Sequence, residues 1–529
     1  MAADTAGRMT NSARVLRGLL AAAVCLAVLI GAGYIGAAVL HPGPGPLSAA
    51  GGRPMPTAAG ANPVVAENQH AGTTDWRIKD VAASRGIEGY ADHVSAHIGN
   101  TVNLSVSTPA ARYRVQAFRM GYYGGLGGRL IWQSPPQRGS LQVTPTVQAP
   151  TFTVEARWKP TTTIHVDPTW PPGDYLLKLA GDGGQQRYVP LTVVDDTSTA
   201  ALVIQNAVTT WQAYNNWGGY NLYNGPDQAF ASRSRIVSFD RPYAGDGSGD
   251  FLGNEFPLVY FAESYGLDVT YWTDIDLHER GAQLLGNHRG LITLGHDEYW
   301  TRPMRAAATD GRDRGVNLAF LGANAVFRQI RLEASPLGSD RRVVDYKDAG
   351  EDPLDASAKG LVTVNWRDPP VNLPESSLIG QSFECNPAKA DAVVVDATSW
   401  LFDNAGVQDG DTLSGVVGPW YDRVNPAYPT PPNLEVLMHS PVSCPTLGPS
   451  YSDMTYYTAT SGAGVFSTGT TTWVCELTAS CLQDPRSHPD LTVLQVTKNL
   501  LLAFGAGPAG QAHPSKPNVT ALHIDNPKK

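Results

Sequence analysis

One ten-residue segment, residues 291–300, limits what this chain can fold into more than any other part of it. The segment reads Leu-Ile-Thr-Leu-Gly-His-Asp-Glu-Tyr-Trp, so an apolar run ends in a glycine and a dense polar and aromatic cluster follows at once. A helix is expected next, over residues 304–314, because Thr301 and Pro303 are typical of a helix start. Residues 317–321 form a second buried run. This order of strand, polar turn, helix and strand predicts a βαβ unit of a parallel sheet.

The polar cluster after the first of these strands is a candidate active site. In open parallel sheets, ligands bind outside the carboxyl ends of the strands, which is where His296 and Glu298 are expected to lie. Asn324 follows the next parallel strand and is expected at the same edge. A simpler interpretation is that Asp297 and Glu298 only add negative charge to the first turn of the following helix. That role alone would not require histidine, glutamate, tyrosine and tryptophan in one turn.

A second cluster, residues 210–224, follows the first predicted strand of the same sheet, residues 201–204. In this cluster tyrosines and tryptophans alternate with asparagine, glutamine and glycine. It is expected to face the same crevice, where aromatic walls with polar tips can line a pocket. A stacking platform for sugars and simple loop packing are the alternative interpretations.

The amino-terminal residues predict the compartment. Three arginines precede an uncharged, apolar stretch at residues 18–40, which is long enough to cross a membrane as a helix. The positive-inside rule places residues 1–17 in the cytoplasm and everything after the stretch outside, behind a flexible Pro- and Gly-rich linker at residues 41–73. We therefore expect a single-pass protein of the cell membrane with extracytoplasmic C-terminal domains. The alternative is secretion after signal cleavage, since residues 48–50 offer small side chains to a peptidase.

The rest of the chain divides into two predicted domains and a tail, residues 509–529. Short alternating runs between Gly/Pro turns over residues 74–196 predict an antiparallel β-sandwich. In residues 197–508 buried runs alternate with helical stretches. That alternation predicts a doubly wound, mostly parallel α/β domain with a flavodoxin-like or glutamine-amidotransferase-like layout.

The cysteines agree with an oxidising compartment. One of the five lies in the apolar stretch, which leaves an even number in the exported part. The short spacing favours a Cys475–Cys481 pair, with Cys385–Cys444 as the second pair, although four cysteines allow three pairings. No Cys-x-x-Cys motif accompanies them, which disfavours a zinc site.

Charge and composition exclude other classes of protein. The net charge is -9, without the basic stripe of a nucleic-acid binder, so no nucleic-acid partner is expected. Only 16% of the residues are charged, and the 54 glycines and 40 prolines indicate a loop-rich exported protein rather than a disordered one. A serine hydrolase is disfavoured because the chain has no Gly-x-Ser-x-Gly elbow with a clear His/Asp complement.

Several motifs, in their order along the chain, resemble the C-terminal domain of the large (beta) subunit of N,N-dimethylformamidase. They are Gln-Ala-Tyr-Asn and Asn-Leu-Tyr-Asn in the second cluster, Arg-Pro-Tyr at residues 241–243, Gly-His-Asp-Glu-Tyr-Trp at residues 295–300 and Leu-Gly-Ala-Asn at residues 321–324. The resemblance covers roughly residues 75–505. Gly-His-x-Glu-Tyr-Trp is its most specific element.

This resemblance implies an amidohydrolase that acts on carbon–nitrogen bonds other than peptide bonds and holds a mononuclear iron (Fe³⁺) with two tyrosines and one glutamate. Carried over position by position, the ligands are Tyr214, Tyr223 and Glu298, with Tyr220 and Tyr243 as alternatives for the second tyrosine. Phenolate and carboxylate are hard oxygen donors suited to Fe(III), and three protein ligands leave positions for water and a carbonyl oxygen.

A metal-assisted hydrolysis is therefore expected. His296 would orient Glu298 or act as general base, and Asn324 could bind the carbonyl or the oxyanion. The family enzyme works in the cytoplasm with a small partner subunit, whereas this chain is expected outside. The expected substrate is a small-molecule amide or a component of the cell envelope. The competing expectation is a non-enzymatic cell-surface module that binds glycan or peptide through its aromatic loops.

Overall fold

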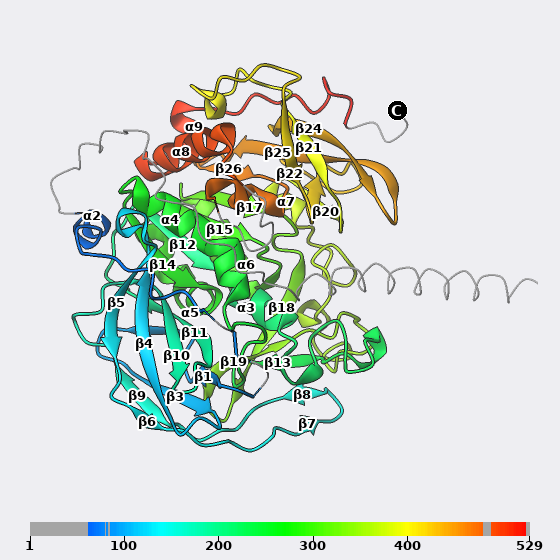
Figure 1. The fold of residues 1–529 in the computed structure, drawn as a ribbon. Helices are drawn as coiled ribbons and strands as arrows, with labels where there is room; N and C mark the ends of the chain where they lie inside the picture. The colour runs from blue at the N-terminus through cyan, green and yellow to red at the C-terminus, as the bar shows by residue number, and fades with distance from the viewer. Residues whose placement is uncertain (1–61, 80, 83–84, 480–487, 525–529) are drawn as a thin grey trace, which may run out of the picture.

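A computed structural model describes residues 62–79, 81–82, 85–479 and 488–524 of the protein (Figure 1). These residues are rich in β-structure and form seven sheets of two to seven strands. The longest helix among them, α8 (Leu491–Ala506), has 16 residues. A body of two sheets, blue to cyan in Figure 1, lies beside a larger mixed sheet that carries the functional residues.

The first body comprises two sheets that share one hydrophobic core. Alternate residues of the strands, such as Val102 and Leu104, or Val115 and Ala117, point into this core and are buried, which explains the period of two in the sequence. All pairings are antiparallel except β2 with β11. One sheet has the order β1 (Glu88–Ala91), β3 (Thr101–Ser107), β9 (Thr162–His165). The other has the order β2 (Ser95–His97), β11 (Gln186–Val194), β10 (Gly173–Gly181), β4 (Arg112–Met120), β5 (Gly128–Gln133), and β6 (Gln137–Arg138) also pairs with β4. An arm with β7 (Val147–Gln148) and β8 (Thr153–Val154) leaves this body.

The mixed sheet has seven strands. Its order is β14 (Val269–Thr273), β12 (Leu202–Asn206), β15 (Gly290–Gly295), β17 (Asn317–Gly322), β26 (Gly464–Ser467), β25 (Gly448–Thr458), β24 (Glu435–Cys444). The first five strands are parallel, and β25 and β24 close the sheet as an antiparallel hairpin. Ile292 enters the hydrophobic core on one face and Leu291 the core on the other. Burial on both faces explains why this strand reads as a continuous apolar run.

Short helices connect or cover these strands, and α5 (Asp274–Leu284) packs against α6 (Arg302–Asp313). Helix α6 begins with Thr301 as its N-cap, whose hydroxyl accepts a hydrogen bond from the amide of Met304. The other α-helices of the described residues are α2 (Pro63–Glu67), α3 (Val208–Tyr214), α4 (Phe256–Ser264), α7 (Ser376–Ile379) and α9 (Ala509–Ala512), with a π-helix, η5 (Phe251–Glu255), before α4.

The doubly wound α/β layout predicted for residues 197–508 is wrong. After β17 the chain does not return through helical crossovers but builds small sheets, and only β26 rejoins the parallel strands. The reason is that residues 323–460 hold extended runs separated by Gly, Pro, Asn and Asp turns, which bury their apolar side chains by pairing locally. The small sheets comprise β13 (Ile236–Ser238), β19 (Gly338–Val344), β18 (Arg328–Ser335) and β16 (Tyr299–Thr301); β20 (Ser382–Cys385) with β23 (Tyr421–Arg423); and β21 (Ala390–Val393) with β22 (Thr412–Val417).

Buried polar contacts join the two-sheet body to the mixed sheet. Arg119 of β4 forms an ion pair with Glu263 of α4, with 2.8 Å between Nη2 and Oε1, and both side chains are almost fully buried. The hydroxyl of Tyr271 donates to the same carboxylate at 2.6 Å. Asp174 of β10 accepts a hydrogen bond from Nδ2 of Asn206, at the end of β12. These contacts fix the position of the two-sheet body beside the strands that carry the candidate site.

The expected localisation at the cell membrane needs correction. No helix in the described part of the chain is long and apolar enough to cross a membrane. The segment to which a spanning helix was assigned, residues 18–40, lies outside the described residues. Part of the expected linker forms α2, where Val64 is buried and Glu67 pairs with Arg129 at 2.6 Å. The alternative, secretion after cleavage of a signal peptide, stays a prediction.

The cysteine prediction is confirmed for one pair. Cys385 and Cys444 form a disulfide with a Cα–Cα distance of 6.1 Å. Cys475 is also disulfide-bonded, and Cys481, its predicted partner, lies outside the described residues. The Cys385–Cys444 bond ties the end of β20 to the end of the hairpin strand β24.

Candidate metal centre

The carboxyl ends of three neighbouring parallel strands place the predicted site residues at one edge of the mixed sheet. Strand β12 leads into α3, which ends at Tyr214. His296 directly follows β15, and Asn324 lies two residues after β17. Because β15 pairs with both β12 and β17, the three segments emerge side by side. This is the edge at which the sequence predicted the site.

Two glycines let the ends of β15 and β17 approach each other closely. A Cβ on Gly322 would lie 2.0 Å from the carbonyl oxygen of Gly295. Gly295 itself has a φ of +51°, and a Cβ there would lie 2.6 Å from Cβ of Asn254. The approach places His296 beside Asn324, with 3.0 Å between Nε2 and Nδ2.

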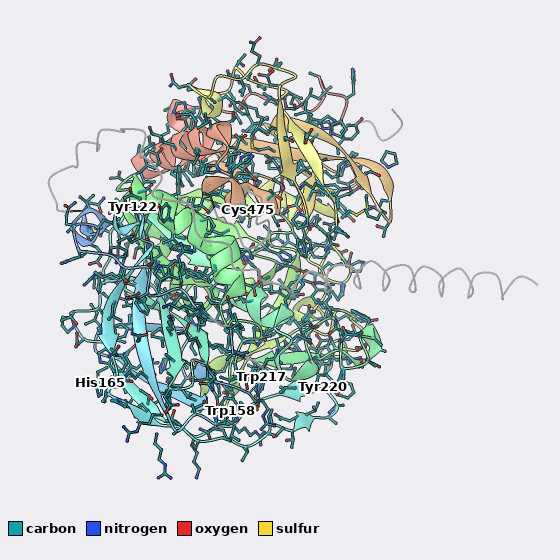
Figure 2. All side chains as sticks on the ribbon, viewed as in Figure 1. Tyr122, Trp158, His165, Trp217, Tyr220 and Cys475 are labelled. Carbon is teal, nitrogen blue, oxygen red and sulfur yellow. A yellow bond between two sulfur atoms is a disulfide. The ribbon has the colours of Figure 1, made fainter. Side chains whose placement is uncertain are left out.

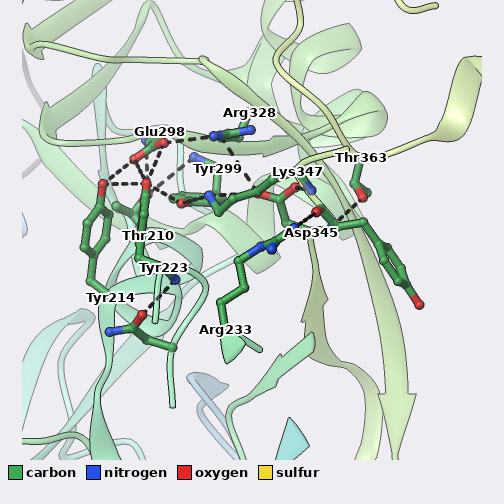
Figure 3. Close-up of polar contacts among 12 residues, drawn as sticks. Thr210, Tyr214, Tyr223, Arg233, Glu298, Tyr299, Arg328, Asp345, Lys347 and Thr363 are labelled. Atoms are coloured by element: carbon green, nitrogen blue, oxygen red, sulfur yellow. Dashed lines mark hydrogen bonds and ion pairs between the residues drawn. The ribbon is translucent and has the colours of Figure 1, made fainter. Parts of the chain in front are cut away.

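Two phenols and one carboxylate converge at this edge (Figure 3). The hydroxyl oxygen of Tyr214 lies 2.8 Å from Oε2 of Glu298. The hydroxyl oxygen of Tyr223 lies 3.0 Å from Oε1 and 3.2 Å from Oε2 of the same carboxylate. The two phenol oxygens are 2.7 Å apart. The structure thus brings together the three residues predicted as metal ligands.

The main chain and the neighbours of Glu298 fix its position. Its amide donates to Oγ1 of Thr210 at 3.1 Å, and its carbonyl accepts from the amide of Arg328 at 2.9 Å. Nε2 of His296 lies 3.1 Å from Oε2. Nε of Arg328 lies 3.7 Å from Oε1. The side chain is almost completely buried, so this carboxylate is rigidly held.

The surroundings keep Glu298 ionised. Burial acts to raise its pKa, but the hydrogen bond and charge of His296, with the charges of Lys347 and Arg328, lower the pKa to about 2. Burial and the Glu298 carboxylate both raise the pKa of Tyr214 and of Tyr223 well above the usual range. The phenols therefore carry their protons at neutral pH, and a cation at this point would have to displace them.

The oxygen positions fit a metal ion of the expected kind. Ligand oxygens at about 2 Å from one cation lie about 2.8–3.3 Å from each other in octahedral or tetrahedral geometry. The oxygens of Tyr214, Tyr223 and Glu298 have separations of 2.7, 2.8, 3.0 and 3.2 Å. No group of three or more His, Cys, Asp or Glu side chains elsewhere in the described residues is arranged to hold a metal. Within the part of the chain that the structure describes, the set of two tyrosines and one glutamate is therefore the candidate donor set.

The structure favours Tyr223 over the two alternative tyrosines. Among the contacts of the described residues, the hydroxyls of Tyr220 and Tyr243 make none with Glu298. Tyr220 stacks on a ring of the β7–β8 arm at 5.9 Å, and Trp217 packs edge-on against Trp158 at 5.7 Å between ring centroids (Figure 2). The middle of the aromatic cluster therefore packs against the two-sheet body and its β7–β8 arm, as the loop-packing interpretation predicted.

Interaction with the N-terminus of the following helix does not explain the carboxylates of Asp297 and Glu298. Helix α6 begins at Arg302, so neither Asp297 nor Glu298 lies in its first turn. Asp297 points instead into a buried polar cluster, where it accepts hydrogen bonds from Gln205 at 3.0 Å and Trp300 at 2.7 Å. Burial raises the pKa of Asp297 to about 7. The two neighbouring carboxylates thus have different environments, and only Glu298 faces the phenols.

Sequence reasoning missed four contributors to the site. Nζ of Lys347 donates to the hydroxyl of Tyr299 at 2.7 Å, and that hydroxyl lies 2.7 Å from the hydroxyl of Tyr223. Arg328 faces Glu298, and Trp420 packs on the ring of His296 at 4.7 Å. Tyr299 is part of the Gly-His-Asp-Glu-Tyr-Trp motif, which is a local signal for its role. Lys347 and Trp420 come from the region without a clear periodic pattern, where no local signal marks them.

A buried arginine fixes the loop that carries Tyr223. Arg241 donates to the backbone carbonyls of Asn215, Trp217 and Tyr220 at 2.9–3.1 Å. Burial lowers the pKa of Arg241 to about 9. This side chain therefore shapes the loop from inside and is not available to bind an anion.

Comparison with known families agrees with the motifs. The family model described as "N,N-dimethylformamidase beta subunit-like, C-terminal" matches residues 114–487, which is more than half of the chain. All five predicted site residues fall within the matched span. A comparison with curated proteins gives no match. The resemblance carried by the sequence motifs is thereby confirmed at the level of the family.

Proposed function

Because the chain belongs to the N,N-dimethylformamidase beta subunit-like family, we propose that it is an iron-dependent hydrolase of carbon–nitrogen amide bonds. The observation that carries this proposal is the convergence of the oxygens of Tyr214, Tyr223 and Glu298 at separations of 2.7–3.2 Å. Two phenolates and one carboxylate would hold Fe(III) through hard anionic donors and balance its charge. Such an ion, when bound, would supply the Lewis acidity that polarises a substrate carbonyl and activates a water molecule.

His296 is the proposed general base. Its Nε2 lies between Oε2 of Glu298 at 3.1 Å and Nδ2 of Asn324 at 3.0 Å, and Trp420 covers one face of the ring. A histidine held in this way can accept a proton from the attacking water and return it to the departing amine. The scissile carbon–nitrogen bond then breaks to give a carboxylate and an amine.

Asn324 is proposed to bind the substrate carbonyl. Its Oδ1 is buried and has no hydrogen-bond partner among the described residues. Its NH₂ group carries two N–H donors, of which one is directed to Nε2 of His296 at 3.0 Å and the other can be offered to a carbonyl oxygen. An amide donor beside the reacting carbonyl would stabilise the oxyanion as it forms. Its backbone amide is anchored to Asp422 at 2.7 Å, so the side chain is held in place.

We propose a small amide, or an amide-containing component of the cell envelope, as the substrate. The Cys385–Cys444 disulfide supports action outside the cytoplasm, because such bonds persist in oxidising compartments. The alternative, a glycan- or peptide-binding module, is less well supported because Trp217 and Tyr220 of the aromatic loop are occupied in packing.

Metal loading combined with an amide assay tests the proposal. The full chain, metal-free or loaded with Fe(III), would be incubated with N,N-dimethylformamide and a panel of small amides, and amine release measured. We expect hydrolysis with iron only, and its loss in Glu298→Gln. Glu279→Gln is the matched control, because Glu279 lies on α5, where its carboxylate pairs with Arg280 at 3.1 Å. Equal iron retention and equal activity in Glu298→Gln and the control would overturn the proposal. A protein that retains glycan but no iron would favour the binding module.

A further inference from the structure

The two tyrosines of the site have unequal surroundings. The hydroxyl of Tyr223 lies 2.7 Å from a third phenol, that of Tyr299. Among the contacts of the described residues, the hydroxyl of Tyr214 has only Tyr223 and Glu298 as partners. In addition, Nζ of Lys347 lies 4.1 Å from the centre of the Tyr223 ring. One phenol therefore faces an extra donor and a positive charge, and the other does not (Figure 3).

The direction of the hydrogen bonds around Tyr299 is fixed by chemistry. Lysine ammonium can only donate, so the 2.7 Å contact between Nζ of Lys347 and the hydroxyl oxygen of Tyr299 occupies an acceptor position on that oxygen. The proton of Tyr299 is then directed to Tyr223, whose own proton is directed to Glu298. A relay of donors thus runs from Lys347 through Tyr299 to Tyr223.

The relay is held rigidly on both sides. Tyr299 starts β16, has no exposed side-chain surface, and its carbonyl accepts from Oγ1 of Thr209 at 2.8 Å. Nζ of Lys347 is additionally paired with Asp345 at 3.2 Å. The backbone of Lys347 has a φ of +60°, a conformation that costs energy in a non-glycine residue. The strained backbone of Lys347 thus places a buried ammonium group against the phenol of Tyr299, and such strain is common at functional sites.

We propose that Tyr299, backed by Lys347, is a positioning residue that makes Tyr223 the weaker electron donor of the two tyrosine ligands and so keeps the metal electrophilic. The inference rests on the proposed function. A hydrogen bond to a metal-bound phenolate oxygen withdraws electron density from it, as partners behind a ligand generally do. With less density donated by Tyr223, the metal retains more Lewis acidity for the substrate carbonyl. Tyr214, without such a donor, is the stronger ligand and the anchor.

The visible spectrum of the iron-loaded full chain tests this inference. Phenolate-to-Fe(III) charge transfer gives an absorption band whose energy rises when the phenolate is stabilised by a hydrogen bond. Tyr299→Phe removes the donor and is expected to move the band to longer wavelength at unchanged iron content. The kcat for amide hydrolysis should fall by about tenfold, the effect of one lost hydrogen bond on a barrier, with little change in KM. Tyr220→Phe, which removes a phenol from the same loop but outside the site, should leave the band in place.

A second variant guards against a folding defect. Lys347→Met leaves Tyr299 in place but removes the donor behind it, so a smaller shift in the same direction is expected. An iron-loaded wild type with the band, and both variants with an unchanged band, would overturn the relay while leaving the proposed function intact. A wild type that binds no iron and shows no band would instead contradict the proposed function.

Discussion

The hydroxyl of Tyr214 lies 2.8 Å from the carboxylate of Glu298, although 84 residues separate the two in the chain. One side chain closes the helix after β12, and the other follows the neighbouring strand β15. Their contact is therefore made by the parallel pairing of the two strands. It places a phenol against a buried carboxylate whose pKa is about 2, which is an arrangement that attracts a hard cation.

Replacement of Glu298 by glutamine should abolish metal binding. The change removes the anionic oxygens that both phenols face, and ligand loss should cost more than the 10- to 100-fold typical of residues behind a ligand, so affinity for Fe(III) should fall by more than about 100-fold. Isothermal titration with Fe(III) measures it. The variant should be less stable than wild type, because Arg328 and Lys347 lose their nearby anion. Unchanged affinity in a folded variant would contradict the ligand assignment.

Replacement of His296 by alanine should separate binding from chemistry. General acid–base groups contribute about 10²–10⁴-fold to rate, so hydrolysis should fall by at least about 100-fold while most of the iron is retained. Iron content and steady-state rates of the same preparation measure the two effects. His165→Ala, an exposed histidine of the two-sheet body, is the control and should match wild type. Full activity in His296→Ala would remove the histidine from the mechanism.

Stability should decline with rising pH through the titration of Asp174. Burial raises the pKa of this carboxyl to about 7, against the hydrogen bonds from Asn206 and Thr192, whereas an unfolded chain has about 3.9. The folded state thus binds the proton more tightly, so the stabilisation is full below about pH 4 and is lost as the pH rises to about 7. In wild type, this titration should lower the free energy of unfolding by up to about 3 kcal/mol between pH 5 and 7. Asp174→Asn should remove that contribution.

Denaturant unfolding of wild type and Asp174→Asn at several pH values measures this difference. Asp167→Asn, at an exposed position of the same body, is the control and should keep the wild-type slope. Parallel stability profiles of wild type and Asp174→Asn would show that the carboxyl does not titrate in this range.

Loss of the Cys385–Cys444 bond should destabilise the hairpin side of the mixed sheet. The two cysteines are 59 residues apart in the sequence. Closing a loop of that length lowers the entropy of the unfolded chain and so raises its free energy by about 4 kcal/mol. The double variant Cys385→Ala/Cys444→Ala should therefore unfold at clearly lower guanidinium concentration. A midpoint equal to that of the wild type would indicate that native packing alone supports this region.

The elements around the site could be predicted because their signals are local. The apolar run at residues 291–294 became β15, and the helix expected over residues 304–314 became α6, Arg302–Asp313. Parallel strands then require His296 and Asn324 to share an edge. The position of Tyr214 followed from the same rule, since it lies one short helix beyond β12.

The overall layout and the more distant contributors could not be predicted in the same way. Which strands pair after β17 depends on contacts between residues far apart in sequence, and the turn-rich region gave no period that would fix them. Lys347 reaches the site only because β18 and β19 form a hairpin beside β16. Trp420 arrives from the segment before β23. A single lysine or tryptophan in a loop carries no local signal of such a destination.

The position of iron in crystals of the iron-loaded full chain tests the central claim most directly. An anomalous difference map from data collected at the iron absorption edge would locate the ion without reference to the protein density. We predict one peak about 2 Å from the hydroxyl oxygens of Tyr214 and Tyr223 and from the carboxylate of Glu298, at the edge formed by β12, β15 and β17. A peak bound by other residues, or no peak in protein that has been saturated with Fe(III), would contradict the account.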